Sequence, residues 1–189
     1  MGKIFRALCA SALLGVPCLA WADAPMPLQA IPSLNIERYV GRWYEIAKFP
    51  NWFQRKCTAD TTAEYTLNSD GSVRVVNQCR TSAGEMLQAT GQAKQIGGDA
   101  SPRLRVRFAP EWLSFLPFLW GDYWVIDLDE AYALAAVSEP GRDYLWILSR
   151  TPTVDSVPYE ALLSRLARMG LDIGRLEKSP QPFALRSPS

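Results

Sequence analysis

Few side chains of this 189-residue chain are suited to acid–base, nucleophilic or metal chemistry. There is no histidine, which removes the commonest general base, proton shuttle and zinc ligand. Nucleophiles that depend on histidine are therefore excluded, and the residue types predict no metal site and no cofactor. Glu45 and several tyrosines are the reactive groups that the strand pattern would carry inward, so any catalysis would be confined to carboxylate or phenol chemistry.

The first 22 residues have the layout of a secretory signal peptide. A basic start precedes an apolar stretch that is too short to span a bilayer, and Ala20-Trp21-Ala22 forms an A-x-A cleavage site. Cleavage after Ala22 predicts a periplasmic protein. The alternative is an outer membrane lipoprotein modified at Cys18, although Pro17 directly before this cysteine fits that pattern poorly.

Removal of the signal peptide changes the net charge and leaves one pair of cysteines. Without Lys3 and Arg6, 18 basic residues remain beside 19 acidic ones, and this net charge of −1 argues against a nucleic-acid partner. Cys57 and Cys79 are then an even pair in an oxidising compartment, which predicts a disulfide. Closing this loop is worth about 3 kcal/mol.

The mature chain reads as strands joined by short turns, of which NSDG at 68–71 is the clearest. With no helix between them, eight such strands form an antiparallel up-and-down sheet that closes into a barrel. One helix follows, capped by Asp155 or Ser156 and ended by Gly170, and we expect it outside the barrel. The predicted strands are 41–49, 61–67, 72–79, 86–95, 103–108, 123–128, 132–137 and 144–150.

Three motifs lie in order along this pattern: NIERYVGRWYEIAKFP at 35–50, GDYWVIDLDEAY at 121–132 and YLWILSRTP at 144–152. Together they resemble the signatures of the lipocalin family, most of all the bacterial Blc-type, apolipoprotein D-like lipocalins. The resemblance implies an all-β barrel with one C-terminal helix packed outside, and binding of fatty acids or lysophospholipids. The resulting layout is a signal peptide at 1–22, a Pro-rich arm at 23–34, the lipocalin domain at 35–178 and a tail at 179–189.

Gly41, Trp43 and Arg150 are expected to close one end of the barrel. The first and last strands are neighbours in a closed barrel, so the Arg150 guanidinium can stack on the Trp43 indole for about 0.5–2 kcal/mol. Gly41 allows the backbone to approach closely. These residues are structural and carry no chemistry.

Alternation along each strand, counted from Trp43, gives the residues that line the interior. Small side chains among them leave space for a ligand, and the lining suits an acyl chain with a modest head group. Arg103, Arg105 and Arg107 fall on the opposite, solvated face. The predicted lining is Glu45, Ala47, Phe49, Ala63, Tyr65, Val75, Asn77, Leu87, Ala89, Val106, Phe108, Tyr123, Val125, Ala133, Ala135, Trp146 and Leu148.

The loops of an up-and-down barrel alternate between its two ends. The apolar runs PNWF at 50–53 and PEWLSFLPFLWG at 110–121 therefore meet at the open end. Such a patch indicates contact, and three interpretations stay open: ligand gating or peripheral membrane docking, a homodimer contact, or folding back onto the barrel. The residues concerned are Trp52, Phe53, Trp112, Leu113, Phe115, Leu116, Phe118, Leu119 and Trp120.

The leading hypothesis is thus a non-enzymatic binder, store or carrier of small apolar ligands in the bacterial cell envelope. Tyr65, Asn77, Tyr123 and Glu45 are the candidate polar contacts inside, although each would equally serve as a structural hydrogen-bonding group. A protein-interaction module that uses the aromatic mouth is the main alternative, and an enzyme acting through Glu45 is the other.

Overall fold

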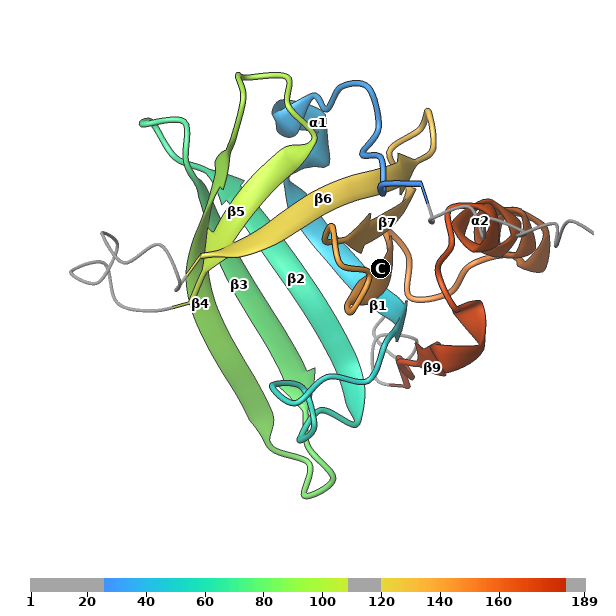
Figure 1. The fold of residues 1–189 in the computed structure, drawn as a ribbon. Coiled ribbons are helices and arrows are strands. Elements are labelled where there is room, and N and C mark those ends of the chain that lie inside the picture. Colours follow the sequence, from blue (N-terminus) through green and yellow to red (C-terminus); the bar gives the residue numbers. More distant parts are fainter. Residues whose placement is uncertain (1–25, 109–119, 183–189) are drawn as a thin grey trace, which may run out of the picture.

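The structure is a computed structural model that describes residues 26–108 and 120–182. Its strands form a closed antiparallel barrel, as predicted (Figure 1). Each of β2 to β7 pairs with the next strand along the chain, and β1 pairs with both β8 and β2 to close the circle. The strands are β1 (Gly41–Lys48), β2 (Ala59–Leu67), β3 (Val73–Arg80), β4 (Met86–Gln95), β5 (Arg103–Arg107), β6 (Gly121–Leu128), β7 (Leu134–Ser138), β8 (Leu145–Ser149) and the short β9 (Glu177–Lys178).

One end of the barrel, which we call the base, is closed by the short helix α1 (Ile36–Tyr39), seen at the top of Figure 1. The side chain of Asn35 caps this helix by accepting a hydrogen bond from the Arg38 amide at 2.9 Å. Tyr39, the last residue of this helix, and Trp43 are both buried, and the Trp43 indole donates to the Tyr39 carbonyl at 2.8 Å. We call the opposite end the mouth.

Arg150 holds the base together, as the motifs indicated. Its guanidinium carbon lies 3.9 Å from the centroid of the Trp43 ring. Gly41 adopts a φ of +96°, and a Cβ atom there would meet Arg150 Nη1 at 3.3 Å. The guanidinium also donates hydrogen bonds of 2.8–3.2 Å to the main-chain carbonyls of Arg38, Tyr39, Val40, Arg42 and Tyr132.

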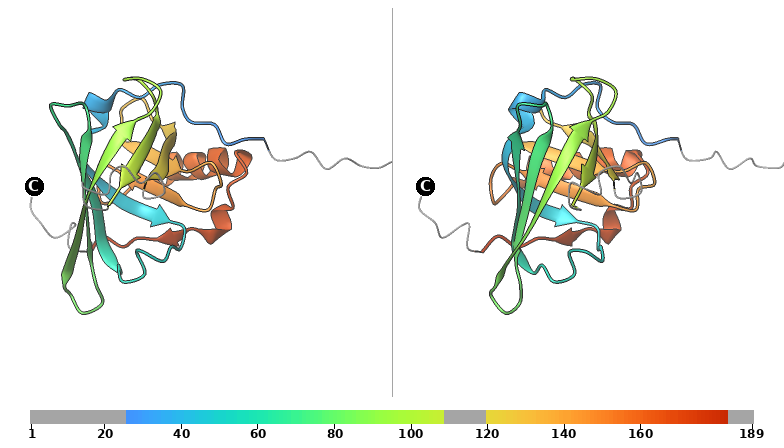
Figure 2. Two further views of the ribbon diagram at one scale, coloured as in Figure 1. Left: turned by 60° about the vertical axis from the view of Figure 1, so that its left-hand side comes forward. Right: turned by 90° about the vertical axis from the view of Figure 1, so that its left-hand side faces the viewer.

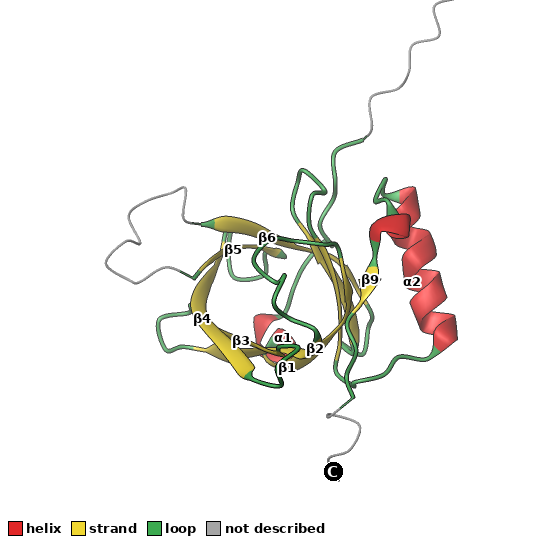
Figure 3. Ribbon diagram, turned by 90° about the horizontal axis from the view of Figure 1, so that it is seen from below, coloured by secondary structure: helices red, strands yellow, loops and turns green. Residues whose placement is uncertain are grey.

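Helix α2 (Ser156–Arg168) packs outside the barrel, as expected (Figure 3). Leu162 and Leu166 are buried in an outer apolar cluster with residues of β6, β7 and β8, such as Ile147. Asp155 occupies the N-cap position without a side-chain hydrogen bond, and Gly170 follows the end of the helix with a φ of +80°. In the described part of the chain, no helix combines the length and apolarity needed to cross a bilayer.

A β-bulge in β1 overturns two of the predicted lining positions. The register between β1 and β8 shifts between Glu45 and Ala47, so Ile46 and Ala47 both contact the outer cluster. A single extra residue reverses the alternation of every side chain that follows it. Ala47 and Phe49 therefore pack beneath α2, and their predicted place in the interior is wrong.

Two further positions differ from the alternation pattern. Arg107 is only 3% exposed, with its guanidinium carbon 5.0 Å from the Trp120 ring centroid, so the expectation of a solvated side chain is wrong there. Ala133 lies before β7 in the base turn, where its amide donates to Asp129 Oδ1 at 2.6 Å. After this turn β7 begins only at Leu134, so Ala133 lies outside the strand that the sequence predicted to contain it.

The segment after α2 joins two strands that separate toward the mouth. β1 and β2 pair only from Gly41 to Tyr44 on the β1 side. Beyond this point β9 pairs with β1, and the Gln181 side-chain amide donates to the main-chain carbonyls of Glu45 and Thr61 at 2.8 and 2.9 Å. The start of the predicted tail is thus part of the barrel wall. The short helix η3 (Ile173–Arg175) connects α2 to this segment.

Candidate functional site: the barrel interior and its mouth

The interior is filled at the base and becomes more accessible toward the mouth. Leu34, Tyr39 and Trp43 are fully buried in the inner cluster. Residues that pack against this cluster farther along the strands, such as Val106 and Trp146, are only partly buried. The predicted lining residues that belong to this cluster or pack against it are Ala63, Tyr65, Val75, Val106, Tyr123, Val125, Ala135, Trp146 and Leu148.

The hydroxyls of three tyrosines form a polar layer next to the base, on its mouth side. Tyr123 Oη lies 2.7 Å from Tyr39 Oη and 3.0 Å from Tyr65 Oη. Tyr65 is on β2 and Tyr123 on β6, which are not neighbours in the sheet, so their contact crosses the interior. Burial raises the pKa of Tyr65 to about 12 and raises the pKa of the other two hydroxyls well above the ordinary value. These hydroxyls are therefore neutral at physiological pH and act as hydrogen-bonding groups.

The wall of the barrel is incomplete at the mouth. β4 pairs with β5 only from Gln92 to Gln95, so 86–91 has no partner strand on that side among the described residues. Figure 2 shows β4 extending beyond β5 in both views. Leu87 and Ala89 belong to this part of β4, and both are exposed although their register with β3 puts them on the inner face.

The remaining predicted lining residues lie at this mouth. The Phe108 ring packs against the inner side of Gly91, where a Cβ atom would meet it at 2.7 Å. The side-chain oxygen of Asn77 is buried without a hydrogen-bond partner among the described residues. An unpaired buried acceptor is costly, so Asn77 is suited to meet a donor from a ligand or water.

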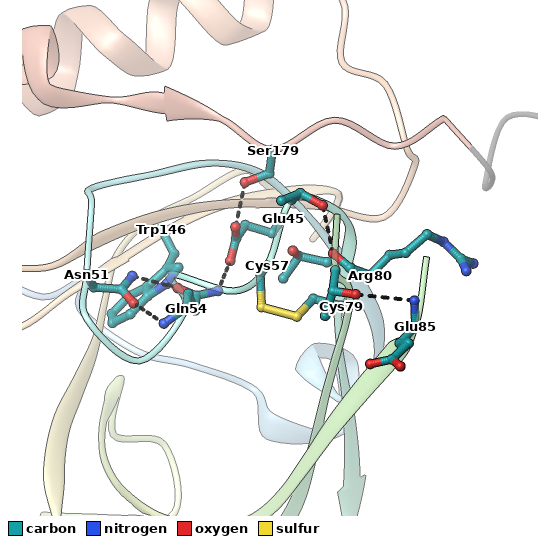
Figure 4. The surroundings of a disulfide bond; sticks show 12 residues. Glu45, Asn51, Gln54, Cys57, Cys79, Arg80, Glu85, Trp146 and Ser179 are labelled. Carbon is teal, nitrogen blue, oxygen red and sulfur yellow. Dashed lines mark hydrogen bonds between the residues drawn. A yellow bond between two sulfur atoms is a disulfide. The ribbon is translucent and has the colours of Figure 1, made fainter. Parts of the chain in front are cut away.

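A hydrogen-bond network fixes the loop between β1 and β2 at the mouth (Figure 4). The Gln54 side chain donates to Glu45 Oε2 at 2.6 Å and accepts from the Trp146 indole at 3.0 Å. The Ser179 hydroxyl donates to the other Glu45 oxygen at 2.5 Å. Both carboxylate oxygens of Glu45 are thus engaged in positioning the loop and the segment after β9.

Burial raises the pKa of Glu45, while the hydrogen bonds from Ser179 and Gln54 oppose that shift. Because its two oxygens are already bonded, the carboxylate is not free to act as a general base. Sequence reasoning missed Gln54 and Ser179, since neither side chain has a strand position or a motif that marks it. Within the described ranges, no group of side chains is arranged to hold a metal ion.

The predicted disulfide is present. Cys57 and Cys79 join the loop after β1 to the end of β3, next to the Glu45 network in Figure 4. Arg80 follows Cys79 and forms an ion pair with Asp60 at 3.0 Å. The disulfide therefore ties the loop to the barrel at β3.

The aromatic residues of the mouth are only partly within the described ranges. Trp52 is 73% exposed. The ring of the exposed Phe53 is tilted against those of Tyr144 and Trp146, with centroid distances of 5.7 and 6.2 Å. Trp120 is half-buried beside Arg107. The other predicted mouth residues lie outside the described residues: Trp112, Leu113, Phe115, Leu116, Phe118 and Leu119.

A closed eight-stranded barrel with a sealed base, an apolar interior and one accessible end is an architecture that holds small ligands. Residues 34–181 match the family described as a lipocalin-like domain. The chain belongs to the lipocalin family, whose members generally bind small hydrophobic ligands.

Individual relatives agree with this assignment. The chain is 40% identical over 155 residues to temperature-induced lipocalin-1 of Arabidopsis thaliana, which covers 82% of this chain and 83% of the relative. It is 38% identical over 175 residues to the outer membrane lipoprotein Blc of Citrobacter freundii, covering 92% and 94%. Insecticyanin from the tobacco hornworm Manduca sexta shares the fold with a TM-score of 0.62 at 16% identity, over 80% and 83% of the two chains.

The raised pKa of Glu45 predicts a specific pH dependence of stability. The native state keeps this proton to higher pH than the unfolded chain, so the stability contributed by Glu45 is present in acid and falls as pH rises above about 4.5 through the raised pKa of the folded state. Glu45→Gln cannot titrate. Urea denaturation of both proteins across this range should show the wild type losing stability relative to the variant, and a difference that does not change with pH would contradict the assignment.

Proposed function

We propose that this protein binds and carries a single-chain lipid, a fatty acid or a lysophospholipid, in the bacterial cell envelope, without catalysis. The observation that carries the proposal is the contrast between the two ends of the barrel. The base is sealed by Arg150 and Trp43, whereas the inner face of β4 is exposed at Leu87 and Ala89. An apolar interior with one accessible end accepts a long, narrow ligand that enters by one end.

The energetics of burial are adequate for such a ligand. Each methylene removed from water contributes about 0.8 kcal/mol, so a long acyl chain gives roughly 10 kcal/mol before ordering costs. Those costs leave an expected dissociation constant of roughly micromolar or tighter. The alanines of the inner face, such as Ala63, Ala89 and Ala135, make room for the chain where larger side chains would fill the barrel.

The charged head group would stay at the mouth. Arg55 and Lys56 are exposed on the loop after β1, next to the disulfide, where a carboxylate or phosphate can meet them without being buried. The envelope location is supported by the relationship to outer membrane lipoprotein Blc and by the export signal in the sequence. Export to the periplasm with cleavage after Ala22 remains our expectation, and lipidation at Cys18 is its alternative.

A second proposal concerns the mouth as a membrane-docking surface. The 73% exposed indole of Trp52 stands next to Phe53, and the basic residues Arg55 and Lys56 follow within the same loop. Exposed aromatic rings beside basic side chains suit the interface of an anionic bilayer. A ligand could then pass between membrane and barrel through the accessible end.

Lipid binding is tested by native mass spectrometry of the mature protein purified without delipidation, with organic extraction in parallel. The expected result is one acyl species bound per barrel, identified by its mass and fragmentation. A protein that is empty as purified and shows no tryptophan quenching when titrated with hexadecanoic acid would contradict the proposal and would favour a protein-binding role for the mouth.

Membrane docking is tested by sedimentation with vesicles that contain anionic phosphatidylglycerol. Trp52→Ser should weaken vesicle binding about tenfold, because it removes an exposed indole from the contact. Ile96→Ser is the matched control, since Ile96 is 48% exposed but lies beyond β4 at the base end. Equal binding by the wild type and both variants would rule out docking through this loop.

A further inference from the structure

We infer that the hydroxyl of Tyr123 is a hydrogen-bond donor held for the ligand, so that the barrel prefers an apolar chain with a neutral oxygen at its deep end. Such an oxygen is found in a terminal hydroxyl, ketone or ester. The inference rests on the proposed lipid-binding function and specifies the ligand class that fits the interior.

The three hydroxyls of the tyrosine layer cannot satisfy all of their hydrogens among themselves. The hydroxyls of Tyr39, Tyr65 and Tyr123 have three hydrogens, and the two contacts among them use at most two. The described residues offer these hydroxyls no further acceptor. At least one O–H hydrogen of the layer is therefore left for a ligand or a water molecule.

The spare hydrogen belongs to Tyr123. Tyr39 is 2% exposed and Tyr65 is 7% exposed, whereas Tyr123 is more accessible and its oxygen takes part in both contacts. When Tyr39 and Tyr65 both donate, the two lone pairs of Tyr123 are filled and its own hydrogen is available. The opposite arrangement would leave an unsatisfied hydrogen on one of the two more deeply buried hydroxyls, which is costly.

The ligand group that meets the Tyr123 hydrogen is neutral. A buried carboxylate is stable only with several donors or a cation beside it. The tyrosine layer has one donor to offer, and all the nitrogens of Arg150 already donate to main-chain carbonyls at the base. A neutral acceptor needs a single donor, so a hydroxyl or carbonyl oxygen fits this position and a second carboxylate does not.

The basic rim and the tyrosine layer together fix the orientation of the ligand. Its ionised head lies at the mouth near Arg55 and Lys56, and its far end reaches the layer formed by Tyr123 and its two partners. A plain acyl chain would place a methyl group there and leave the Tyr123 hydrogen without an acceptor. An oxygenated chain of the right length removes that cost.

The test compares each of dodecanoic, tetradecanoic and hexadecanoic acid with its ω-hydroxy counterpart, by fluorescence or calorimetric titration of the full mature chain. At the length that reaches the layer, the ω-hydroxy acid should bind the wild type about tenfold tighter than the plain acid. Tyr123→Phe should abolish this preference. Tyr65→Phe is the matched control, because it removes one hydroxyl from the same layer but leaves Tyr123 able to donate, and it should keep the preference.

A second measurement needs no variant. A terminal methyl-ketone analogue of hexadecanoic acid can accept but not donate a hydrogen bond, and it should share the preference if the protein is the donor. The ω-dicarboxylic acid of the same length should bind more weakly than the ω-hydroxy acid.

The outcomes separate this inference from the proposed function. Tight binding of the plain acids with no preference for oxygenated chains at any length would overturn the inference and leave lipid binding intact, with water as the partner of the spare hydrogen. An equal loss of preference in Tyr65→Phe and Tyr123→Phe would overturn the assignment to Tyr123. If none of the acids bound the wild type, both proposals would fail.

Discussion

The contact between Arg150 and the start of the barrel is the constraint on which the rest of the structure depends. A barrel of consecutive strands must join its last strand to its first, and here one guanidinium covers the Trp43 ring and bonds to the carbonyls around it. Charged donors make strong hydrogen bonds when they are partly withdrawn from water. This side chain therefore fixes one end of the barrel as closed, and any ligand must use the other end.

The mouth is assembled by different means, and it depends on segments far apart in the sequence. The bulge after Glu45 turns the end of β1 toward α2, and the residues around β9 then occupy the place beside β1 that β2 has left. Gln54, Ser179 and the disulfide from Cys57 hold the adjoining loop in place. The loop is thus held in place by these contacts while its tip stays exposed, an arrangement that is suited to contact with lipid or membrane.

The polarity of the side chains that line the interior changes from the base to the mouth. At the base, aromatic rings fill the space, and directly above them lies a layer of neutral hydroxyls whose pKa values are raised by burial. Apolar side chains follow, and exposed basic residues stand at the rim. A ligand that is charged at one end and apolar along its length satisfies this sequence of environments better than a compact polar molecule does.

Sequence reasoning could predict the features that depend on period and order. The eight strands, the outer helix and the Arg150–Trp43 contact follow from alternation, turn residues and three motifs, and the disulfide follows from an even cysteine pair in an exported chain. The interior positions of Ala47 and Phe49 were wrong because a bulge leaves no clear mark in the alternation of a short strand. The tyrosine layer could not be predicted either, since Tyr39, Tyr65 and Tyr123 meet only after the barrel has closed.

Hydrogen–deuterium exchange of the mature protein, with and without bound hexadecanoic acid, tests most directly the claim that the base is sealed and the mouth admits the ligand. Amides of the base, such as those around Trp43 and Tyr65, should exchange only through global unfolding. Within 86–91 of β4, the amides that point away from β3 have no β5 partner, so they should exchange quickly in the free protein and slow when the lipid is bound. Fast exchange at the base, or no lipid-dependent change along β4, would contradict this account.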